Sequence, residues 1–361
     1  MRIFLLLTFF FFVGPPLGVS GSARADETVP ATAYFPVLPF DAPADAEPQL
    51  VPLAANHPLE GIHAGLTRAI VVVHDESRDA NAALAVISAL AGSQNAATII
   101  LAPQFLLPSD IVRFADYLPD RGRGFAAWQV LGWSSGDDSM PVPSTKSVSS
   151  FTVMDLLLMY LSDRNAFPDL KEIVIAGFGA GANFIQRYAA FSAAYGAVSR
   201  QNIGLRYVLA SPSSYLYLTA SRPLGGKNGF GLPDASACPS VNDYPYGLEK
   251  LNAYGRRAGA NAAKEDYATR SITYLSAEGK NPNTFLDTTC AALMQGADSA
   301  SRAENYRLYL HTLYGDVAER TQIFAKTREG ANDAVTLFGS ACGMSALFGD
   351  GLCPPSEGGI R

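Results

Sequence analysis

One short segment, residues 172–187, constrains the fold more than any other part of the chain. It reads EIVIAGFGAGANFIQR, which is a β-branched run, a glycine-dense turn and then a helical pattern. The turn at 177–181 has the frame G-x-S-x-G of a nucleophile elbow, the strained strand-to-helix corner that exposes a serine hydroxyl at the end of a parallel sheet. Gly177 and Gly181 keep the two places where a side chain does not fit. Gly179 stands where the serine belongs, so the segment predicts the corner without its nucleophile.

The pattern around this segment is an alternation of strands and helices. Compact apolar runs of about five residues, bounded by turn residues, lie at 69–73, 98–102, 125–130, 172–176, 205–210, 271–275 and 334–338. Such runs are typical of strands that are buried on both faces of a parallel sheet. Helical patterns lie between several of them, at 81–90, 152–161, 182–193 and 302–313. The alternation predicts a doubly wound, mostly parallel α/β sheet.

The first 25 residues have the pattern of a secretory signal peptide. Arg2 precedes an apolar run at 3–13, and Ala23-Arg24-Ala25 forms an A-x-A cleavage site. An apolar run of this length is too short for a permanent anchor. We therefore expect export to the periplasm or beyond, with no transmembrane segment after cleavage. Residues 26–60 are rich in proline and alanine and are predicted to form an extended leader, and 61–361 the α/β domain.

The stretch 219–262 interrupts the alternation. It contains many glycines, prolines and tyrosines and has no clear periodicity. In a sheet of this type, such an insertion lies over the carboxyl ends of the strands, where ligands bind. It is either a lid or cap over a ligand site or a surface loop fixed by a disulfide, and the sequence leaves both interpretations open.

Charge and motif spacing exclude several classes of partner. The formal net charge is −6, and it becomes −8 when Arg2 and Arg24 leave with the signal peptide. The longest run of basic residues is the pair at 256–257, whereas nucleic-acid-binding proteins carry basic patches. The acidic residues of 75–79 lack the register of a calcium loop, and no motif indicates another metal or a cofactor. The sequence identifies no protein partner.

Four cysteines remain after cleavage of the signal peptide: Cys238, Cys290, Cys342 and Cys353. None forms a C-x-x-C pair, which argues against a zinc or thioredoxin-like site. In an exported chain an even number predicts two disulfides, with buried free thiols as the alternative. Proximity favours Cys342–Cys353, which leaves Cys238–Cys290.

Several segments between residues 66 and 348 indicate a particular protein family more specifically than the elbow does. They are Ala102-Pro103-Gln104-Phe105, Gly132-Trp133-Ser134-Ser135-Gly136-Asp137, Ser149-Ser150-Phe151, Phe167-Pro168-Asp169-Leu170, Gln186-Arg187-Tyr188-Ala189, Pro212-Ser213-Ser214-Tyr215-Leu216-Tyr217 and Leu286-Asp287-Thr288-Thr289-Cys290 leading to Gln295-Gly296. Through them the chain resembles a family of secreted α/β-hydrolase-like proteins of bacteria and fungi. In these relatives the elbow typically reads G-H-S-A-G-G, so Phe178 replaces the histidine and Gly179 the serine.

The resemblance also identifies the oxyanion loop, which follows the first predicted strand. In this fold that loop supplies one backbone N–H and the residue after the nucleophile, here Ala180, supplies the other. After His74 the family's glycine is replaced by Asp75, and Glu76 follows. Each carboxylate would oppose a developing oxyanion by about 4 kcal/mol at 4 Å and an effective dielectric of about 20, unless it points into solvent, which would cancel most of this repulsion. The loop is therefore not suited to stabilise negative charge.

The resemblance places the other two triad positions further along the chain. The acid should follow 274–279, which puts Lys280 or a neighbour in its place. The histidine should lie in a turn after the last strand, where the chain has Cys342 within 339–345 and no histidine after His311. Glycine cannot attack a carbonyl, lysine cannot orient an imidazole by accepting its proton, and a disulfide-bonded cysteine cannot act as a base.

These observations favour an exported α/β-hydrolase-fold protein that has lost Ser-His-Asp catalysis and binds a small-molecule or lipid-like ligand. The alternative is an active serine-type ester or amide hydrolase with relocated residues, for which Ser213, Ser214 and Ser345 are the candidates. A dinucleotide site, suggested by G-x-G-x-x-A at the elbow, requires an acidic residue about twenty positions on. Residues 194–204 contain none.

Overall fold

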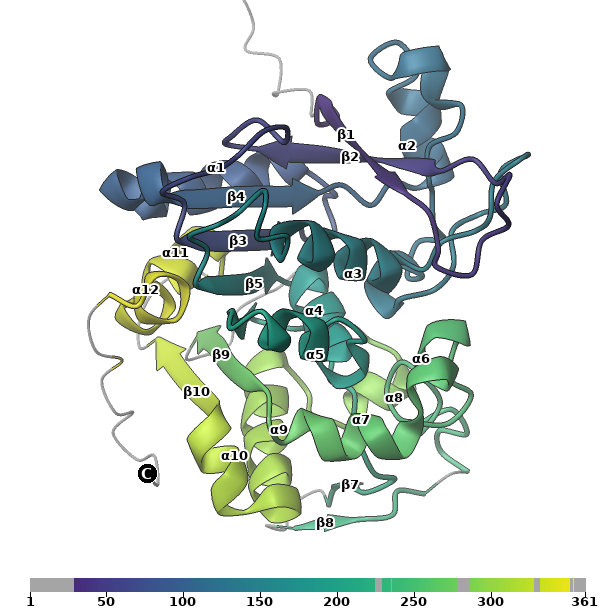
Figure 1. Cartoon of the computed structure of the whole chain (residues 1–361). Coiled ribbons are helices and arrows are strands. Elements are labelled where there is room, and N and C mark those ends of the chain that lie inside the picture. The colour runs from purple at the N-terminus through teal and green to yellow at the C-terminus, as the bar shows by residue number, and fades with distance from the viewer. Residues whose placement is uncertain are drawn as a thin grey trace, which may run out of the picture.

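An eight-stranded sheet runs through the molecule (Figure 1). The computed structural model describes residues 29–224, 229–234, 236–277, 286–327, 332–350 and 353. The strand order is β1-β2-β4-β3-β5-β6-β9-β10. β2 is antiparallel to both of its neighbours, and the strands from β4 to β10 pair in parallel. The strands are β1 (Ala33–Val37), β2 (Gln49–Ala55), β3 (Arg68–Val73), β4 (Thr98–Pro103), β5 (Glu172–Phe178), β6 (Gly204–Ala210), β9 (Ser271–Ala277) and β10 (Gln322–Thr327). This confirms the predicted doubly wound, mostly parallel sheet.

Helices cover both faces of the sheet, which is why its central strands are apolar at nearly every position. α1 (Ala80–Ala91), α11 (Ala334–Gly339) and α12 (Ala341–Phe348) pack on one face, where β5 contributes Val174 and Ala176. α3 (Ser150–Leu161), α4 (Ala180–Phe191) and α9 (Ser299–Tyr314) pack on the other, where β5 contributes Ile173 and Ile175. Successive side chains of a strand point to opposite faces, so a strand covered on both sides reads as one continuous apolar run.

Two of the apolar runs predicted as strands have other structures. The run at 334–338 is helix α11, which begins where the Asp333 carboxylate accepts a hydrogen bond from the Thr336 N–H and buries Leu337 and Phe338 against the sheet. Apolar runs of this length do not distinguish a strand from a buried helical turn. The run at 125–130 forms only isolated bridges, from Phe125 to Leu50 and from Ala127 to Leu106.

The last strand, β10, was not predicted. Among the described strands it lies at the edge of the sheet, where it pairs with β9. Its sequence QIFAKT mixes apolar and polar residues, and Ile323 is half exposed. An edge strand of this kind lacks the continuous apolar run that identifies a central strand.

The prediction that residues 26–60 form an extended leader outside the core is wrong from Ala33 onward. Residues 33–37 and 49–55 are β1 and β2, and the side chains of Val37, Val51 and Leu53 are fully buried. Pro36 lies in the edge strand β1, where a missing N–H costs little. A proline in this segment is therefore compatible with a place at the edge of the sheet.

The described residues of the insertion at 219–262 form a packed segment. It contains the short hairpin of β7 (Arg222–Pro223) and β8 (Phe230–Gly231), helix α6 (Ala253–Ala258) and the start of α7 (Ala260–Tyr267). The Tyr254 hydroxyl donates to the buried Asp155 carboxyl on α3 at 2.7 Å, and the Asn252 amide donates to Asp137 at 2.9 Å. Figure 1 shows β7 and β8 at the end of the molecule opposite α1 and β1.

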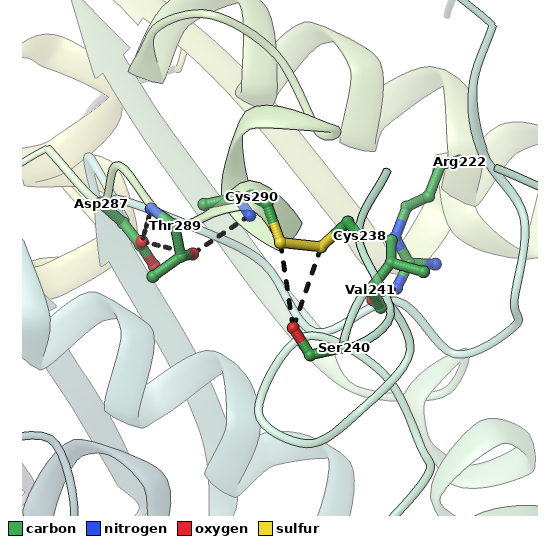
Figure 2. Close-up of a disulfide and its surroundings, with 8 residues drawn as sticks. Arg222, Cys238, Ser240, Val241, Asp287, Thr289 and Cys290 are labelled. Carbon is green, nitrogen blue, oxygen red and sulfur yellow. Dashed lines mark hydrogen bonds between the residues drawn. A yellow bond between two sulfur atoms is a disulfide. The ribbon is translucent and has the colours of Figure 1, made fainter. Parts of the chain in front are cut away.

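Two disulfides join the cysteines in the pairing that proximity favoured. Cys238–Cys290 ties the insertion to the first residue of α8 (Cys290–Leu293), and Cys342–Cys353 connects α12 to the C-terminal segment. Figure 2 shows the first disulfide between the Asp287–Thr289 turn and the loop of Ser240 and Val241. In the part of the chain that the structure describes, none of the helices has the length and apolar character needed to span a bilayer.

Candidate functional site

The corner between β5 and α4 has the backbone of a nucleophile elbow. β5 ends at Phe178, α4 begins at Ala180, and Gly179 between them has φ 55° and ψ −119°. A Cβ on Gly181 would lie 2.3 Å from the Val73 carbonyl oxygen, and one on Gly177 would lie 2.6 Å from the Gly181 carbonyl carbon. Both distances are far below a van der Waals contact, so the close approach of β5, α4 and the end of β3 requires these glycines.

His74, at the end of β3, has a structural role. Its ring is buried against Phe105 and Trp133. Nε2 accepts a hydrogen bond from the Phe105 N–H at 3.0 Å, and Nδ1 lies 2.9 Å from the Asp75 carbonyl oxygen, to which it donates. Burial lowers the pKa of His74 to about 4. The ring is therefore neutral at physiological pH, with both nitrogens engaged by backbone groups.

The loop from β3 to α1 is fixed by its own polar contacts. The Asp75 carboxylate accepts hydrogen bonds from the N–H and the hydroxyl of Ser77, at 2.9 and 2.5 Å. The Arg78 guanidinium pairs with the Asp110 carboxylate at 2.7 Å, and Asp79 caps the start of α1. The Asp75 side chain is thus turned into its own loop, which leaves the neighbouring carboxyl, that of Glu76, to face the elbow.

Glu76 fills the space where a nucleophile's side chain would begin. A Cβ built on Gly179 would lie 2.8 Å from Glu76 Oε2 and 3.4 Å from Oε1. The backbone N–H groups of Glu76 and Ala180 both act on this carboxyl. They belong to the loop after the first parallel strand and to the residue after the nucleophile position, which are the two sources of an oxyanion hole in this fold. The sequence indicated an unfavourable charge here, but not that both N–H groups would act on one carboxyl.

Burial is the main influence on the acidity of this carboxyl. It raises the pKa of Glu76 to about 7; the nearby charge of Asp75 also raises it, and the two backbone N–H groups oppose the rise. Desolvation favours the neutral form of a carboxyl, and a second carboxylate acts in the same direction. Glu76 is therefore a mixture of neutral and charged forms near neutral pH.

This pKa predicts the pH dependence of stability. A carboxyl whose pKa is about 7 in the folded protein and about 4.5 when unfolded binds more protons in the folded state, so stability falls as pH rises through this window. The difference between the folded and unfolded pKa values corresponds to about 3 kcal/mol in the free energy of unfolding. Relative to wild type, Glu76→Gln should gain up to about that much free energy of unfolding between pH 5 and pH 8. Urea unfolding at four pH values measures it.

The exposed Asp116 provides the control for this prediction. Its side chain is 81% exposed, so Asp116→Asn should follow the wild-type dependence. Parallel stability curves for wild type and Glu76→Gln would contradict the raised pKa.

The four histidines of the chain all lie among the described residues. His57 contacts the Asn95 carbonyl oxygen before β4, and His63 stacks on Phe167 before β5, so both lie at the amino ends of the parallel strands. His311, in the last turn of α9, is 3.1 Å from the Glu319 carboxylate. His74 lies at the carboxyl ends of the parallel strands, and both of its ring nitrogens are hydrogen-bonded to backbone groups.

The assignment of Cys342 to the base position is wrong. It assumed a last strand at 334–338, but that segment is α11 and the last strand ends at Thr327. Cys342 lies in α12 and is bonded to Cys353. The base position therefore follows Thr327, where residues 328–331 read REGA. These residues and Lys280 lie outside the described part of the chain.

The serines proposed as relocated nucleophiles have partners other than imidazoles. The buried Ser213 hydroxyl accepts a hydrogen bond from the Asn183 amide at 2.8 Å. The buried Ser214 hydroxyl accepts one from the Arg187 guanidinium at 3.3 Å. Ser345 lies in α12, away from the elbow in sequence and on the helix that carries Cys342. Neither Ser213 nor Ser214 is arranged as an activated nucleophile, which requires an adjacent base.

A cavity of about 150 Å³ lies beside the elbow, on the face covered by α1 and α11. Its wall is mostly apolar and includes Phe178, with Asp75, Ser77 and Asp79 at the polar side. A much smaller cavity, of about 10 Å³, lies between Ser211, Ser276 and Asp298. Among the described residues of 219–262, none lines either cavity, so neither cavity corresponds to a pocket beneath that part of the insertion. Within the described ranges, no group of three His, Cys, Asp or Glu side chains could hold a metal ion.

Comparison with known proteins shows similarity to proteins of the α/β-hydrolase fold. No profile of a known protein family and no curated protein matches the sequence. The structure is similar to that of a poly(3-hydroxybutyrate) depolymerase from Bordetella parapertussis, with a TM-score of 0.55 and 16% identity over 90% of this chain and 91% of that one. It is also similar to poly(aspartic acid) hydrolase-1 from Sphingomonas sp. KT-1, with a TM-score of 0.52 and 17% identity over 86% of this chain and 96% of that one. At these identities the similarity shows the α/β-hydrolase fold alone.

Proposed function

We propose that this chain is an exported α/β-hydrolase-fold protein that has lost Ser-His-Asp catalysis and acts by binding a ligand. One observation carries the proposal: the nucleophile position is Gly179, and the carboxyl of Glu76 lies where a side chain at this position would begin. The elbow has no atom that could attack a carbonyl. Loss of a triad nucleophile alone costs about six orders of magnitude in turnover.

The missing base supports the same conclusion. Each of the four histidines is accounted for by contacts that leave none facing Gly179. In this fold the triad histidine follows the nucleophile and the acid in the chain, and no histidine follows His311. A serine relocated near the elbow would therefore also lack an activating imidazole.

The cavity beside Phe178 is the ligand site we propose. A dry cavity of about 150 Å³ with apolar walls is large enough for a molecule the size of benzene. The walls of this one come from Val72, Ala83, Val86 and Phe338, with the carboxylates of Asp75 and Asp79 at one side. We expect a small, single-ring or short-chain apolar ligand there. A thermal-shift screen of such molecules tests this, with the cavity-filling variant Ala83→Leu as the control that should lose the response.

Export is part of the proposal. The pattern of residues 1–25 is that of a cleaved signal, and two disulfides are the form expected in an oxidising compartment. We propose that the mature chain functions in the periplasm or outside the cell.

The test of lost catalysis uses the wild-type protein. Purified protein is incubated with a fluorophosphonate probe and, separately, with a short-chain p-nitrophenyl ester, alongside an active serine hydrolase. We expect no covalent labelling of any serine and no hydrolysis above the buffer rate. Stoichiometric labelling would reject the proposal and favour the alternative, an active hydrolase with relocated residues; mass spectrometry of the labelled peptide would identify its serine.

A further inference from the structure

Two backbone N–H groups converge at the carboxyl end of β5. One belongs to Glu76, in the loop after β3, and the other to Ala180, the first residue of α4. Both act on one carboxyl group, so they point to one place. The first turn of a helix of this length also carries partial positive charge. The donors that hold an oxyanion in an active hydrolase are thus in position here.

The group that occupies this place belongs to the chain itself. The Oε2 and Oε1 atoms of Glu76 lie 2.8 and 3.4 Å from the point where a Cβ at residue 179 would be. No residue other than glycine fits there unless the carboxyl moves away. Gly179 and Glu76 are therefore coupled: the missing side chain of one makes room for the carboxyl of the other.

The carboxyl also does what a helix cap would do. The first N–H groups of a helix have no partner within it, and a side chain at the N-cap usually satisfies one of them. The N-cap of α4 is Gly179, which makes no side-chain bond. The Glu76 carboxyl, from a different loop, supplies the acceptor for Ala180 instead.

We propose that the oxyanion site of this chain is intact and holds the Glu76 carboxyl as a built-in ligand, so that the site binds a small organic carboxylate once that side chain is removed. The inference rests on the proposed function, because it treats the elbow as a binding site and not a reaction centre. A free carboxylate presents the same two acceptor oxygens to the same N–H donors. In wild type it must displace Glu76 to reach them.

The experiment compares butyrate binding to four forms of the full protein at pH 7.5, by isothermal titration. They are wild type, Glu76→Ala, Glu76→Gln and Asp116→Asn. Glu76→Ala removes the carboxyl from the oxyanion site, whereas Glu76→Gln keeps an amide oxygen there. Asp116→Asn removes one negative charge from an exposed side chain that lines neither cavity. It therefore controls for the general attraction of an anion to a less acidic surface. Butanol serves as the neutral ligand of the same chain length.

We expect Glu76→Ala to bind butyrate at least tenfold more tightly than the other three forms, with no such gain for butanol. Equal butyrate affinity in Glu76→Ala and Asp116→Asn would overturn the inference, as would a matching gain in Glu76→Gln. If Glu76→Ala does not fold, ¹³C NMR titration of the glutamate carboxyls in wild type decides the matter. A Glu76 carboxyl that titrates as a solvated side chain is not held in the site.

The two proposals fail separately. Fluorophosphonate labelling of wild type would reject the loss of catalysis without altering the butyrate comparison. Equal butyrate affinities would reject the built-in ligand and leave the unlabelled, inactive protein as proposed.

Discussion

Gly181→Ala should abolish folding or lower the free energy of unfolding by about 3 kcal/mol or more. The added Cβ would lie 2.3 Å from the Val73 carbonyl oxygen and 2.6 Å from that of His74. These are backbone atoms of the central strand β3 and of the residue after it, so no side-chain rotation relieves the contact. Overpacking a rigid interior typically costs 1–3 kcal/mol, and separating two backbone segments costs more. Soluble yield and urea unfolding measure the effect.

Gly196→Ala is the matched control for this substitution. Gly196 lies in α5 (Tyr195–Arg200), and the nearest atom to its added Cβ is the end of the Arg200 side chain, at 3.5 Å. Alanine is a better helix former than glycine by up to about 1 kcal/mol, so this variant should be as stable as wild type or more stable. If Gly181→Ala unfolds at the same urea concentration as Gly196→Ala, the close approach at the elbow is not present in solution.

Removing the disulfide that fixes the insertion is the second change with a large expected effect. Cys238 and Cys290 are 52 residues apart, and a cross-link over such a loop contributes about 4 kcal/mol in the chain-entropy model. The double variant Cys238→Ser, Cys290→Ser should therefore lose about that much free energy of unfolding. Removing Cys342–Cys353, which closes a loop of 11 residues, should cost less, about 3 kcal/mol.

Urea unfolding of both double variants against wild type measures these losses. A wild-type protein whose stability does not change on complete reduction would contradict the prediction, because it would show that neither bond constrains the unfolded chain. A larger loss from the Cys342–Cys353 variant would show that loop length does not determine the order.

The central strands could be predicted from the sequence, and the edges of the sheet could not. β3, β4, β5, β6 and β9 are buried on both faces over most of their length, and this burial gives each a mostly apolar run. β1 carries a proline and β10 carries polar residues because an edge strand has one unpaired side. The sequence therefore indicated a leader for β1 and β2, and gave no sign of β10. This omission also moved the expected base position from the end of β10 to α12.

The site was predictable to the extent that it depends on backbone geometry. Gly177, Gly179 and Gly181 identify the elbow because a tight corner restricts residue type locally. The contact between Glu76 and Gly179 joins two loops that are distant in sequence, and it depends on which of two adjacent carboxyls turns toward the elbow. Ser77 and Arg78 determine this by holding Asp75 and the loop in place. Only the folded arrangement brings these constraints together.

We propose that the elbow retains its backbone but has no nucleophile and no base to activate one. Gly179→Ser alone tests it imperfectly, since Glu76 would obstruct the new side chain. The double variant Gly179→Ser, Glu76→Gly restores a hydroxyl and clears the oxyanion site. We predict that it hydrolyses a short-chain p-nitrophenyl ester no faster than wild type, because no imidazole lies within reach of the serine. Turnover that is robust and abolished by a fluorophosphonate would contradict the claim, since it would require a base at the elbow.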